Sequence, residues 1–370
     1  MTPVIELNDK IVKILRDLMI SQKRKIKESF ELTKKIEIGN INNFDITNVR
    51  KHKGFGGTTY VVSANLSTSN HGIMGGGMVI KFPNNLEEEK KNAYSLHVLC
   101  KKRQEHWDTS TKKHELPDII KSMPDYIFAP NVLETVSIPE TNTSCLMLEF
   151  VDGAIPLVDS YEKGGLTEKL KLLGYSLARL HGPISMNTNI SIYNPIFNHL
   201  AKSVDKDALN NWYEICKNAQ GSVEYIHGDS HLQNILKAKV FGSQEAIAWI
   251  DAMLVETSDR MDDVGYAISY LIQNDVQTFF NQGMDYNNIF SAINSNVVTK
   301  WVPTVLEAYN ATVNLKSLYT YFPLDFFIGA HCIIRADLWD QQSIKNLLLQ
   351  IGQHYILNAP IFQSMNEQSL

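Results

Sequence analysis

The chain has 370 residues, 44% of them hydrophobic and 20% charged, which is typical of a folded globular protein with room for two hydrophobic cores and excludes a disordered one. Its net charge of −5 at pH 7 provides no basic field for a phosphate backbone, so we expect no nucleic-acid partner. No apolar run is long enough to cross a membrane and the N-terminal segment is too charged for a secretory signal, so we expect a cytoplasmic protein without a membrane partner.

The first predicted element is an amphipathic helix, because leucine and isoleucine recur at helical spacing over positions 7–18. The next segment favours strands and turns. A glycine turn over 53–59 precedes a β-branched run over 60–64. A second glycine cluster, 75–77, is predicted as a loop before the strand 78–82. We therefore expect two strands joined by a loose hairpin.

The first glycine turn is a candidate phosphate-binding element. Its glycines, Gly54, Gly56 and Gly57, let backbone N–H groups approach phosphate oxygens because no Cβ stands in the way. Most glycine turns are only turns, so this signal depends on its neighbours. The pattern G-x-x-x-x-G-K-[ST] does not occur in the sequence, which argues against an ordinary P-loop NTPase.

Lys81 lies at the end of the strand 78–82, and a helix beginning at Leu86 follows at once. The apolar residues of this helix recur on one face, and Glu89 lies on the same inward face. An ion pair between Lys81 and Glu89 would hold the ammonium group beside nucleotide phosphates. Glu88 is the alternative partner.

The rest of the chain divides into three segments with different predicted structure. Residues 103–125 are polar and contain prolines, so we expect an insertion with little regular structure. A hairpin of two strands, 131–138 and 145–151, comes next. The rest is mostly helical, with helices predicted over 166–181 and 209–217.

Two polar loops, each after an apolar run, carry the strongest functional signal. The first contains His227-Gly228-Asp229 and Asn234, and the second contains Asp251. The spacing from Asp229 to Asn234 matches the catalytic loop H-R-D-x-x-x-x-N of phosphoryl-transfer enzymes. In that loop the aspartate accepts the proton of the attacking hydroxyl, the asparagine holds Mg²⁺, and a later aspartate holds the metal ions. Asp229 is therefore the candidate base, and Asn234 and Asp251 are the candidate metal ligands.

Three polar residues near these loops have supporting roles. The ring of His227 is better explained as fixing the loop backbone than as the base. His231 either faces the site or packs against its surroundings. Asp263 either caps the helix that starts there or holds the Asp229 loop by hydrogen bonds.

The chain resembles the aminoglycoside phosphotransferase/choline kinase family in the order of its motifs. The family pattern HGDxHxxN is matched over residues 227–234, and the D…DxA element is matched by Asp251, Asp263 and Ala267. The resemblance implies an α+β, bilobal protein-kinase-like fold. Its parts would be a helical segment over 1–43, a small mainly β N-lobe over 44–151 and a larger mainly α C-lobe over 152–370.

The resemblance also implies ATP and Mg²⁺ as cofactors, with backbone groups around Glu149 and Val151 pairing with adenine. The implied activity is transfer of the γ-phosphate to a hydroxyl of a small molecule, with aminoglycoside, amino alcohol, sugar and homoserine-like acceptors all open. The oligomeric state is open as well. Two alternatives are an atypical RIO-like protein kinase, which also tolerates a glycine after the histidine, and a non-catalytic nucleotide-binding regulator. The absence of D-F-G at Asp251 argues against a regulated protein kinase.

Overall fold

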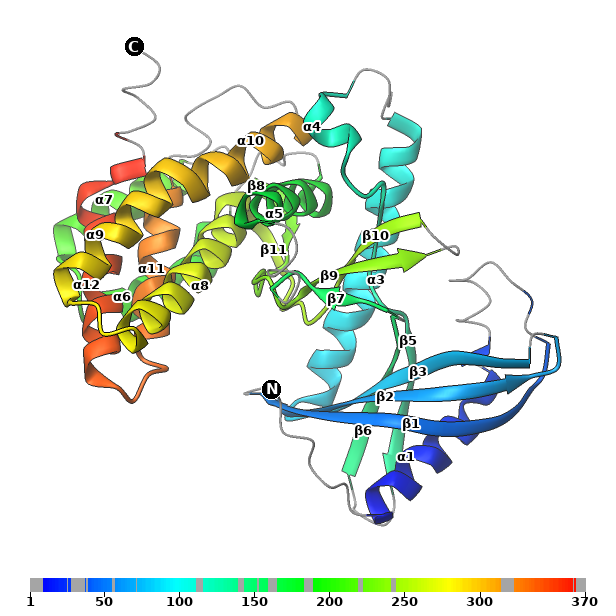
Figure 1. The fold of residues 1–370 in the computed structure, drawn as a ribbon. Coiled ribbons are helices and arrows are strands. Elements are labelled where there is room, and N and C mark those ends of the chain that lie inside the picture. The colour runs from blue at the N-terminus through cyan, green and yellow to red at the C-terminus, as the bar shows by residue number, and fades with distance from the viewer. Residues whose placement is uncertain are drawn as a thin grey trace. The chain divides into compact units, whose positions relative to one another are not determined.

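Figure 1 presents the computed structural model of the chain, with the helix and strand labels used below. It describes residues 9–24, 26–27, 37, 39–54, 57–70, 72–110, 116–138, 143–151, 153–158, 165–182, 189–218, 222–240, 244–313, 323–361 and 363. The chain divides into two units, each described by itself. Unit 1 consists of residues 1–106, 124–156 and 236–251, and unit 2 consists of residues 107–123, 157–235 and 252–370.

Unit 1 is built on a five-stranded antiparallel sheet in the order β1-β2-β3-β6-β5 (Figure 1). Its strands are β1 (Ile41–Gly54), β2 (Gly57–Thr68), β3 (Gly72–Pro83), β5 (Val132–Ile138) and β6 (Thr143–Glu149). Alternate residues of β2 are buried, as expected for a strand with one face on a core. Helix α1 (Asp9–Ser21) contributes Leu15, Leu18 and Met19 to that core.

The glycine cluster Gly75–Gly77 lies inside β3, so the loop predicted for it is wrong. β2 and β3 pair continuously from Gly57 opposite Pro83 to Thr68 opposite Gly72. A Cβ on Gly77 would lie 2.2 Å from the carbonyl oxygen of Val62. Gly77 is therefore required by the close approach of neighbouring backbone within the sheet, and not by a turn.

A second, four-stranded sheet of unit 1 has the order β4-β10-β9-β7. Its strands are β4 (Tyr126–Phe128), β7 (Ile155–Pro156), β9 (Ile235–Val240) and β10 (Gln244–Trp249). Val151, Ala238 and Ala248 form its small buried core. Because β10 ends just before Asp251, this sheet brings that aspartate into unit 1.

Helix α3 (Leu86–Ser110) is longer than the sequence predicts. Residues 103–110 belong to it, and α4 (Asp118–Lys121) forms further on, so the expectation of little regular structure over 103–125 is wrong for these segments. Gln104 shows the physical reason. Its side chain donates to the Asp125 carbonyl at 3.3 Å and accepts from the Ile127 N–H at 2.9 Å, which ties this end of the helix to β4.

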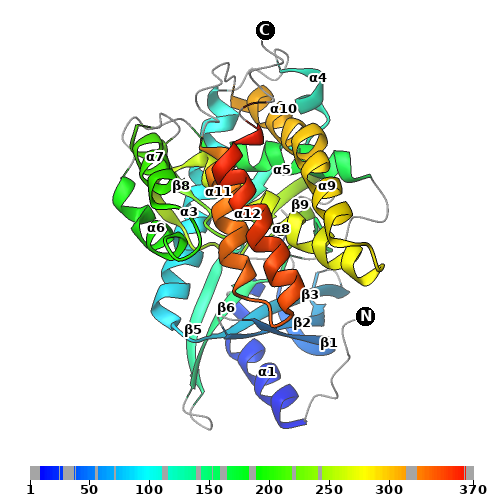
Figure 2. The same ribbon diagram turned by 90° about the vertical axis from the view of Figure 1, so that its left-hand side faces the viewer.

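Unit 2 is mainly helical, and α11 lies beside both α8 and α12 (Figures 1 and 2). Its main helices are α5 (Leu166–His181), α6 (Asn194–Leu200), α7 (Lys206–Lys217), α8 (Arg260–Asn281), α9 (Tyr286–Asn296), α10 (Val302–Val313), α11 (Leu324–Ala336) and α12 (Gln342–Asn358). A 3₁₀ turn (Ile190–Tyr193) and a π-helical turn (Val297–Trp301) precede α6 and α10. Strands β8 (Ser222–Ile226) and β11 (Val255–Asp259) form an antiparallel pair.

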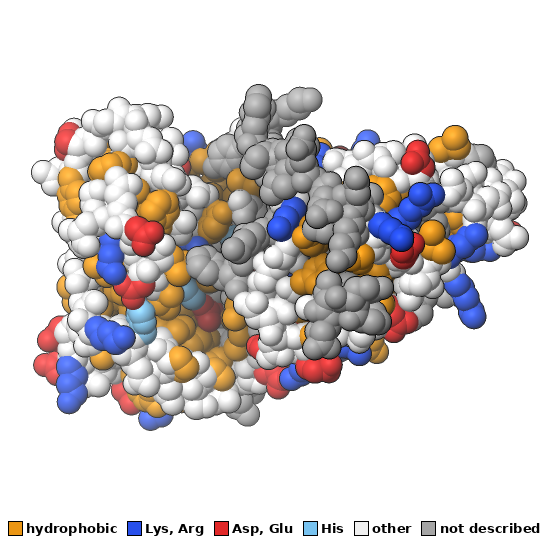
Figure 3. Space-filling model, turned by 90° about the horizontal axis from the view of Figure 1, so that it is seen from below, with side chains coloured by type: hydrophobic (Ala, Val, Ile, Leu, Met, Phe, Trp, Pro, Cys, Tyr) orange, Lys and Arg blue, Asp and Glu red, His pale blue; other side chains and the backbone are white. Residues whose placement is uncertain are grey.

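The predicted α+β class, with a smaller mainly β part and a larger mainly α part, is confirmed. The predicted helices 166–181 and 209–217 correspond to α5 and α7. Among the described residues, no helix has the length and apolar character needed to cross a membrane. Acidic and basic side chains are interspersed on the face drawn in Figure 3.

Candidate active site

Lys81 lies on β3, opposite Thr59 of β2 and Leu146 of β6. Its Nζ contacts Glu89 Oε1 at 2.5 Å and also contacts Asp251 Oδ1. Only 9% of Lys81 is exposed. Burial alone would lower the pKa of Lys81, but the charges and hydrogen bonds of Asp251 and Glu89 raise it above its ordinary value. Lys81 is therefore held as a cation between two carboxylates.

The partner of Lys81 is Glu89 and not Glu88. The Glu88 carboxylate accepts a hydrogen bond from Asn85 Nδ2 at 2.8 Å, and the Glu88 N–H donates to Asn85 Oδ1 at 3.3 Å. Asn85 directly precedes α3, so this exchange is similar to a capping box at the start of the helix. The cap occupies Glu88, and Glu89 lies about 100° further around the helix, on the side of Lys81.

Asp251 reaches Lys81 from a loop that directly follows β10. Its backbone has a φ of +57°, in the left-handed region that costs a non-glycine residue roughly 1–2 kcal/mol. Buried residues of β10, Ile247 and Trp249 among them, fix the strand before it. The Asp251 side chain itself is 43% exposed, and only its Oδ1 is seen in contact with Lys81.

Gly54 and Gly57 face each other at the end of the β1–β2 hairpin, and Gly56 lies outside the described residues. Gly57 has a φ of +139°, and a Cβ on it would lie 2.2 Å from the Phe82 carbonyl oxygen. Phe82 follows Lys81 on β3, so a larger residue at Gly57 would displace the hairpin from the strand that carries the lysine. Gly57 therefore has a packing role, and phosphate binding by the turn stays a prediction.

Glu149 and Val151 lie where the chain leaves β6. The Glu149 N–H donates to the Asn131 carbonyl at 2.9 Å, and the Glu149 carboxylate accepts from the Asn131 N–H at 3.2 Å. Val151 is buried, and its carbonyl accepts from the Ala154 N–H at 3.2 Å. Asp152 lies outside the described residues. The strand thus ends in a turn as expected, and its pairing with adenine stays a prediction.

In unit 2, residues 227–234 form the loop between β8 and β9. The Met253 N–H donates to the His227 carbonyl at 2.9 Å, which continues the pairing of β8 beyond its end. Gly228 has a φ of +78°, and a Cβ there would lie 3.2 Å from both Met253 Cβ and Val255 Cγ2. A glycine is therefore the residue that this position accepts without strain.

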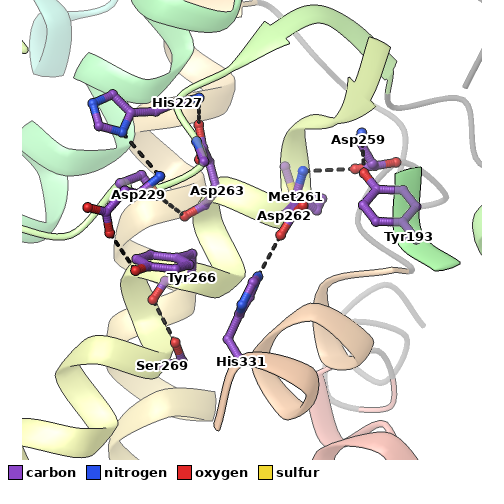
Figure 4. Close-up of polar contacts among 12 residues, drawn as sticks. Tyr193, His227, Asp229, Asp259, Met261, Asp262, Asp263, Tyr266, Ser269 and His331 are labelled. Carbon is purple, nitrogen blue, oxygen red and sulfur yellow. Dashed lines mark hydrogen bonds and ion pairs between the residues drawn. The ribbon is translucent and has the colours of Figure 1, made fainter. Parts of the chain in front are cut away.

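Asp229, the candidate base, is fixed through both carboxylate oxygens. Oδ2 accepts a hydrogen bond from Asn234 Nδ2 at 2.9 Å. Oδ1 accepts one from the Tyr266 hydroxyl (Figure 4). Asn234 Nδ2 also donates to the Asp229 carbonyl at 2.9 Å. The amide nitrogen of Asn234 is thus occupied by Asp229, which turns the amide oxygen away from that residue.

Asp263 holds the backbone of the loop (Figure 4). Its Oδ2 accepts from the His227 N–H at 2.7 Å, and its Oδ1 accepts from the Gly228 N–H at 2.9 Å. The His181 ring nitrogen Nε2 lies 2.9 Å from Oδ2. Ser230 adds a hydrogen bond from its hydroxyl to the Asp263 carbonyl at 2.7 Å. The loop is thus anchored to the first turn of α8 at three residues, His227, Gly228 and Ser230.

The charge of Asp263 is stabilised by these donors. Burial alone would raise the pKa of Asp263, but the hydrogen bond and charge of His181, together with His227, hold it below its ordinary value. The N-cap of α8 is Asp259, whose carboxylate accepts from the Met261 N–H at 2.8 Å. Of the two roles considered for Asp263, it therefore holds the loop, and the cap role is wrong.

The two histidines of the loop differ in their surroundings. His227 is buried, and its Nδ1 accepts from the Asp229 N–H at 3.3 Å, which is the backbone-fixing role expected of it. His231 Nε2 lies 3.5 Å from Asp229 Oδ1, and its ring stacks on Tyr270 with centroids 4.6 Å apart. His231 therefore both faces the carboxylate and packs against an aromatic neighbour.

Asn234 and Asp251 offer an amide oxygen and a carboxylate oxygen to a metal ion. Such oxygen donors suit Mg²⁺, which proteins hold with one or two groups besides water and phosphate oxygens. Within the described part of the chain, no group of three or more His, Cys, Asp or Glu side chains could hold a metal ion by itself. Metal binding by Asn234 and Asp251 stays a prediction. They belong to different units, Asn234 to unit 2 and Asp251 to unit 1.

The structure brings together Lys81, Glu89 and Asp251 in unit 1, and Asp229 with Asn234 in unit 2. Sequence reasoning missed Tyr266 as a direct partner of Asp229. A usable signal was present, because Asp263, Tyr266 and Tyr270 recur at intervals of three and four on one face of a helix.

Comparisons with known proteins find similarity in structure and none in sequence. No protein-family model matches the sequence, and no curated protein sequence matches it. Choline kinase LicA from Streptococcus pneumoniae has a TM-score of 0.43 and 12% identity, over 94% of this chain and 99% of that one. APH(2")-IIia, solved as a GDP and kanamycin complex, has a TM-score of 0.39 and 10% identity, over 85% and 94%. The aminoglycoside phosphotransferase APH(3'')-Id from Streptomyces rimosus has a TM-score of 0.32 and 12% identity, over 82% and 92%.

Proposed function

We propose that this protein is an ATP-dependent phosphotransferase that moves the γ-phosphate of ATP to a hydroxyl group of a small molecule. The contact of Lys81 with both Glu89 and Asp251 carries the proposal. Kinases require a strand lysine paired with a helix glutamate, and an aspartate that holds the metal ions. Here the aspartate is 170 positions away from the lysine in sequence, so this is not a local ion pair of a helix surface.

On the nucleotide side, Lys81 neutralises the α and β phosphates, and Glu89 orients its ammonium group. The N–H groups of the turn with Gly54, Gly56 and Gly57 cover the phosphates. Backbone groups of Glu149 and Val151 pair with the adenine edge. These assignments rest on the order of the elements around Lys81, which is that of a nucleotide-binding β-sheet followed by its helix.

Asn234 and Asp251 would hold Mg²⁺ through their side-chain oxygens. When bound with the nucleotide, Mg²⁺ neutralises charge on the phosphate oxygens and orients them for transfer. The 43% exposure of the Asp251 side chain and the amide oxygen of Asn234 that faces away from Asp229 support this assignment.

Asp229 acts on the acceptor. The acceptor oxygen forms a bond to the γ-phosphorus, the bond from that phosphorus to the bridging β–γ oxygen breaks, and ADP leaves with the electron pair of the broken bond. The proton of the acceptor hydroxyl passes to the Asp229 carboxylate as the new bond forms. The acceptor is an aminoglycoside, an amino alcohol, a sugar or a homoserine-like compound.

An acceptor screen tests the proposal. Panels of these four compound classes are incubated with Mg-ATP, and ADP release is measured for the wild type and for Asp229→Ala, with and without EDTA. We expect acceptor-dependent ADP release by the wild type, loss of it in EDTA, and a decrease of about 100- to 10,000-fold in Asp229→Ala because the proton acceptor is gone. Asp118→Ala, which removes a carboxylate on a highly exposed side chain, should match the wild type.

Three results would contradict the proposal. Acceptor-dependent turnover at the wild-type rate in Asp229→Ala would remove the assigned base. Transfer of the γ-phosphate to protein and to none of the small molecules would favour the RIO-like protein kinase. Binding of Mg-ATP without ADP release in the presence of any of these acceptors would favour a non-catalytic regulator.

A further inference from the structure

One face of α8 is directed at the Asp229 loop. Asp263 and Tyr266 are three positions apart on this helix, so their side chains lie on the same face. Asp263 binds the backbone of the loop at His227 and Gly228, whereas the Tyr266 hydroxyl donates to the Asp229 side chain (Figure 4). A single helix thus fixes both the backbone and the carboxylate of the proposed base.

The hydrogen bonds of the Asp229 carboxylate leave room for an acceptor. Oδ1 receives the Tyr266 hydroxyl and Oδ2 receives Asn234 Nδ2. Each carboxylate oxygen accepts two hydrogen bonds, and His231 Nε2 also lies 3.5 Å from Oδ1, so Oδ2 is the oxygen with a position for an incoming hydroxyl. The Asp229 side chain is 24% exposed, which gives an acceptor access to it. Together the two donors fix the rotation of the carboxylate about its last bond.

The Tyr266 ring is itself held on two sides. The Arg335 guanidinium lies over the ring, 4.4 Å from its centroid, and the His331 ring meets it edge-on at 4.9 Å. Arg335 Nε donates to Ser269 Oγ at 3.0 Å, and His331 Nε2 contacts Asp262 Oδ1 at 2.6 Å. Both side chains come from α11, so the phenol is fixed between two helices of unit 2.

The phenol also keeps its proton. Burial raises the pKa of Tyr266, the neighbouring Arg335 charge works against this, and the Asp229 charge adds to it. At neutral pH the hydroxyl is therefore the donor in its hydrogen bond to Asp229 Oδ1.

We propose that Tyr266 is a positioning residue for phosphoryl transfer, in which its hydroxyl, held by the packing of Arg335 and His331 on its ring, sets the orientation of the Asp229 carboxylate that receives the acceptor proton. This inference rests on the proposed function, because it assigns Tyr266 a role in the same site. It extends the site from the loop motif to α8 and α11.

The test compares Tyr266→Phe with Tyr270→Phe. Tyr266→Phe removes the hydroxyl and keeps the ring between Arg335 and His331. Tyr270→Phe removes a hydroxyl one turn further along α8 that bonds Asn274 instead of Asp229. We expect kcat to fall by about 10- to 100-fold in Tyr266→Phe, because a hydrogen bond to a charged group is lost. The KM for Mg-ATP should change little, and Tyr270→Phe should stay within about twofold of the wild type.

A split between kcat and KM separates positioning from a merely structural effect. The charged and polar groups around Asp229 are Tyr266, Tyr270 and Asp263 on α8, His231 on the loop, and Arg335 and His331 on α11. Tyr266→Phe alters the first of these groups and leaves the others in place. A loss of positioning should lower kcat and leave the KM for Mg-ATP unchanged, whereas a disturbed fold of the site should change both.

A second readout is independent of turnover. At one fixed pH, the side-chain carbon resonance of Asp229, assigned with Asp229→Asn in protein labelled at aspartate Cγ, should change its chemical shift in Tyr266→Phe and keep the wild-type shift in Tyr270→Phe. An unchanged shift in Tyr266→Phe would overturn the inference, whatever the activity. Absence of turnover in the wild type would refute the proposed function, and the carbon chemical shift would still decide whether Tyr266 positions Asp229.

Discussion

The carboxylate of Asp263 is completely buried, and it accepts hydrogen bonds from two backbone N–H groups and from one imidazole. Removing one partner from such a network leaves buried donors without an acceptor, which costs more than an ordinary hydrogen bond contributes. Asp263 therefore stabilises the fold of unit 2, and by doing so it also holds the Asp229 loop in place.

Asp263→Asn should lower the free energy of unfolding by about 2–4 kcal/mol at pH 7, because the amide places an N–H group against a backbone or ring N–H. The pKa of Asp263 in the folded state lies below its value in the unfolded state. The ionised carboxylate therefore adds to the free energy of unfolding above the unfolded pKa of about 3.9, and this addition is lost as the pH falls through the folded-state pKa. The free energy of unfolding, measured with urea between about pH 2.5 and 7, should depend less on pH in Asp263→Asn than in the wild type.

Asp337→Asn is the matched control for this measurement. Its pKa is also lowered, by a hydrogen bond from Lys345 together with the charges around it, but its side chain is 48% exposed. An exposed ion pair contributes little, so we expect a change of less than about 1 kcal/mol. Equal losses for Asp263→Asn and Asp337→Asn would contradict the role given to the buried carboxylate.

At the scale of elements, β3 combines the site lysine with a run of glycines. Gly76 and Gly77 are adjacent on this strand but face different neighbours. A Cβ on Gly77 would meet the backbone oxygen of Val62 at 2.2 Å, whereas one on Gly76 would meet the side-chain carbon Cδ1 of Leu66 at 2.5 Å. A leucine side chain can rotate away, and a paired backbone carbonyl cannot.

Gly77→Ala should therefore destabilise the protein by about 3 kcal/mol, and Gly76→Ala by about 1 kcal/mol. Thermal unfolding of both variants beside the wild type measures the difference. Gly77→Ala should also bind Mg-ATP more weakly than the wild type, because Lys81 lies four positions further along the same strand. A Gly76→Ala variant that is as unstable as Gly77→Ala would show that the sheet tolerates no added methyl group at either position, contrary to this account.

The elements that sequence predicts best are those whose signal is local. The loop with Asp229 and Asn234 and the helix α5 follow from spacing and periodicity alone. The glycines of β3 have low strand propensity and therefore predict a loop, but contacts with β2 override that preference. In the same way, α3 continues through a polar stretch because Gln104 finds backbone partners near β4 that are distant in sequence.

At the scale of the molecule, the residues assigned to the proposed function are distributed over the two units. Lys81, Glu89 and Asp251 belong to unit 1, and Asp229 and Asn234 belong to unit 2. Sequence alone names these residues by motif, but it left Glu88 and Glu89 open because they are adjacent on one helix turn. The contact of Tyr266 with Asp229 joins positions 37 apart. Such long-range pairs depend on tertiary packing, which a single sequence does not encode in any short pattern.

The most direct test of Asp229 as the proton acceptor in phosphoryl transfer measures nucleotide binding and the chemical step separately. Calorimetric titration gives the Kd of Mg-ATP, and quenched-flow single turnover with γ-labelled ATP gives the rate of phosphate transfer to the acceptor. For Asp229→Asn we expect a Kd within about threefold of the wild type and a transfer rate lower by about 100- to 10,000-fold, because the variant keeps the nucleotide contacts and lacks the proton acceptor. Transfer by Asp229→Asn at the wild-type rate would contradict the account.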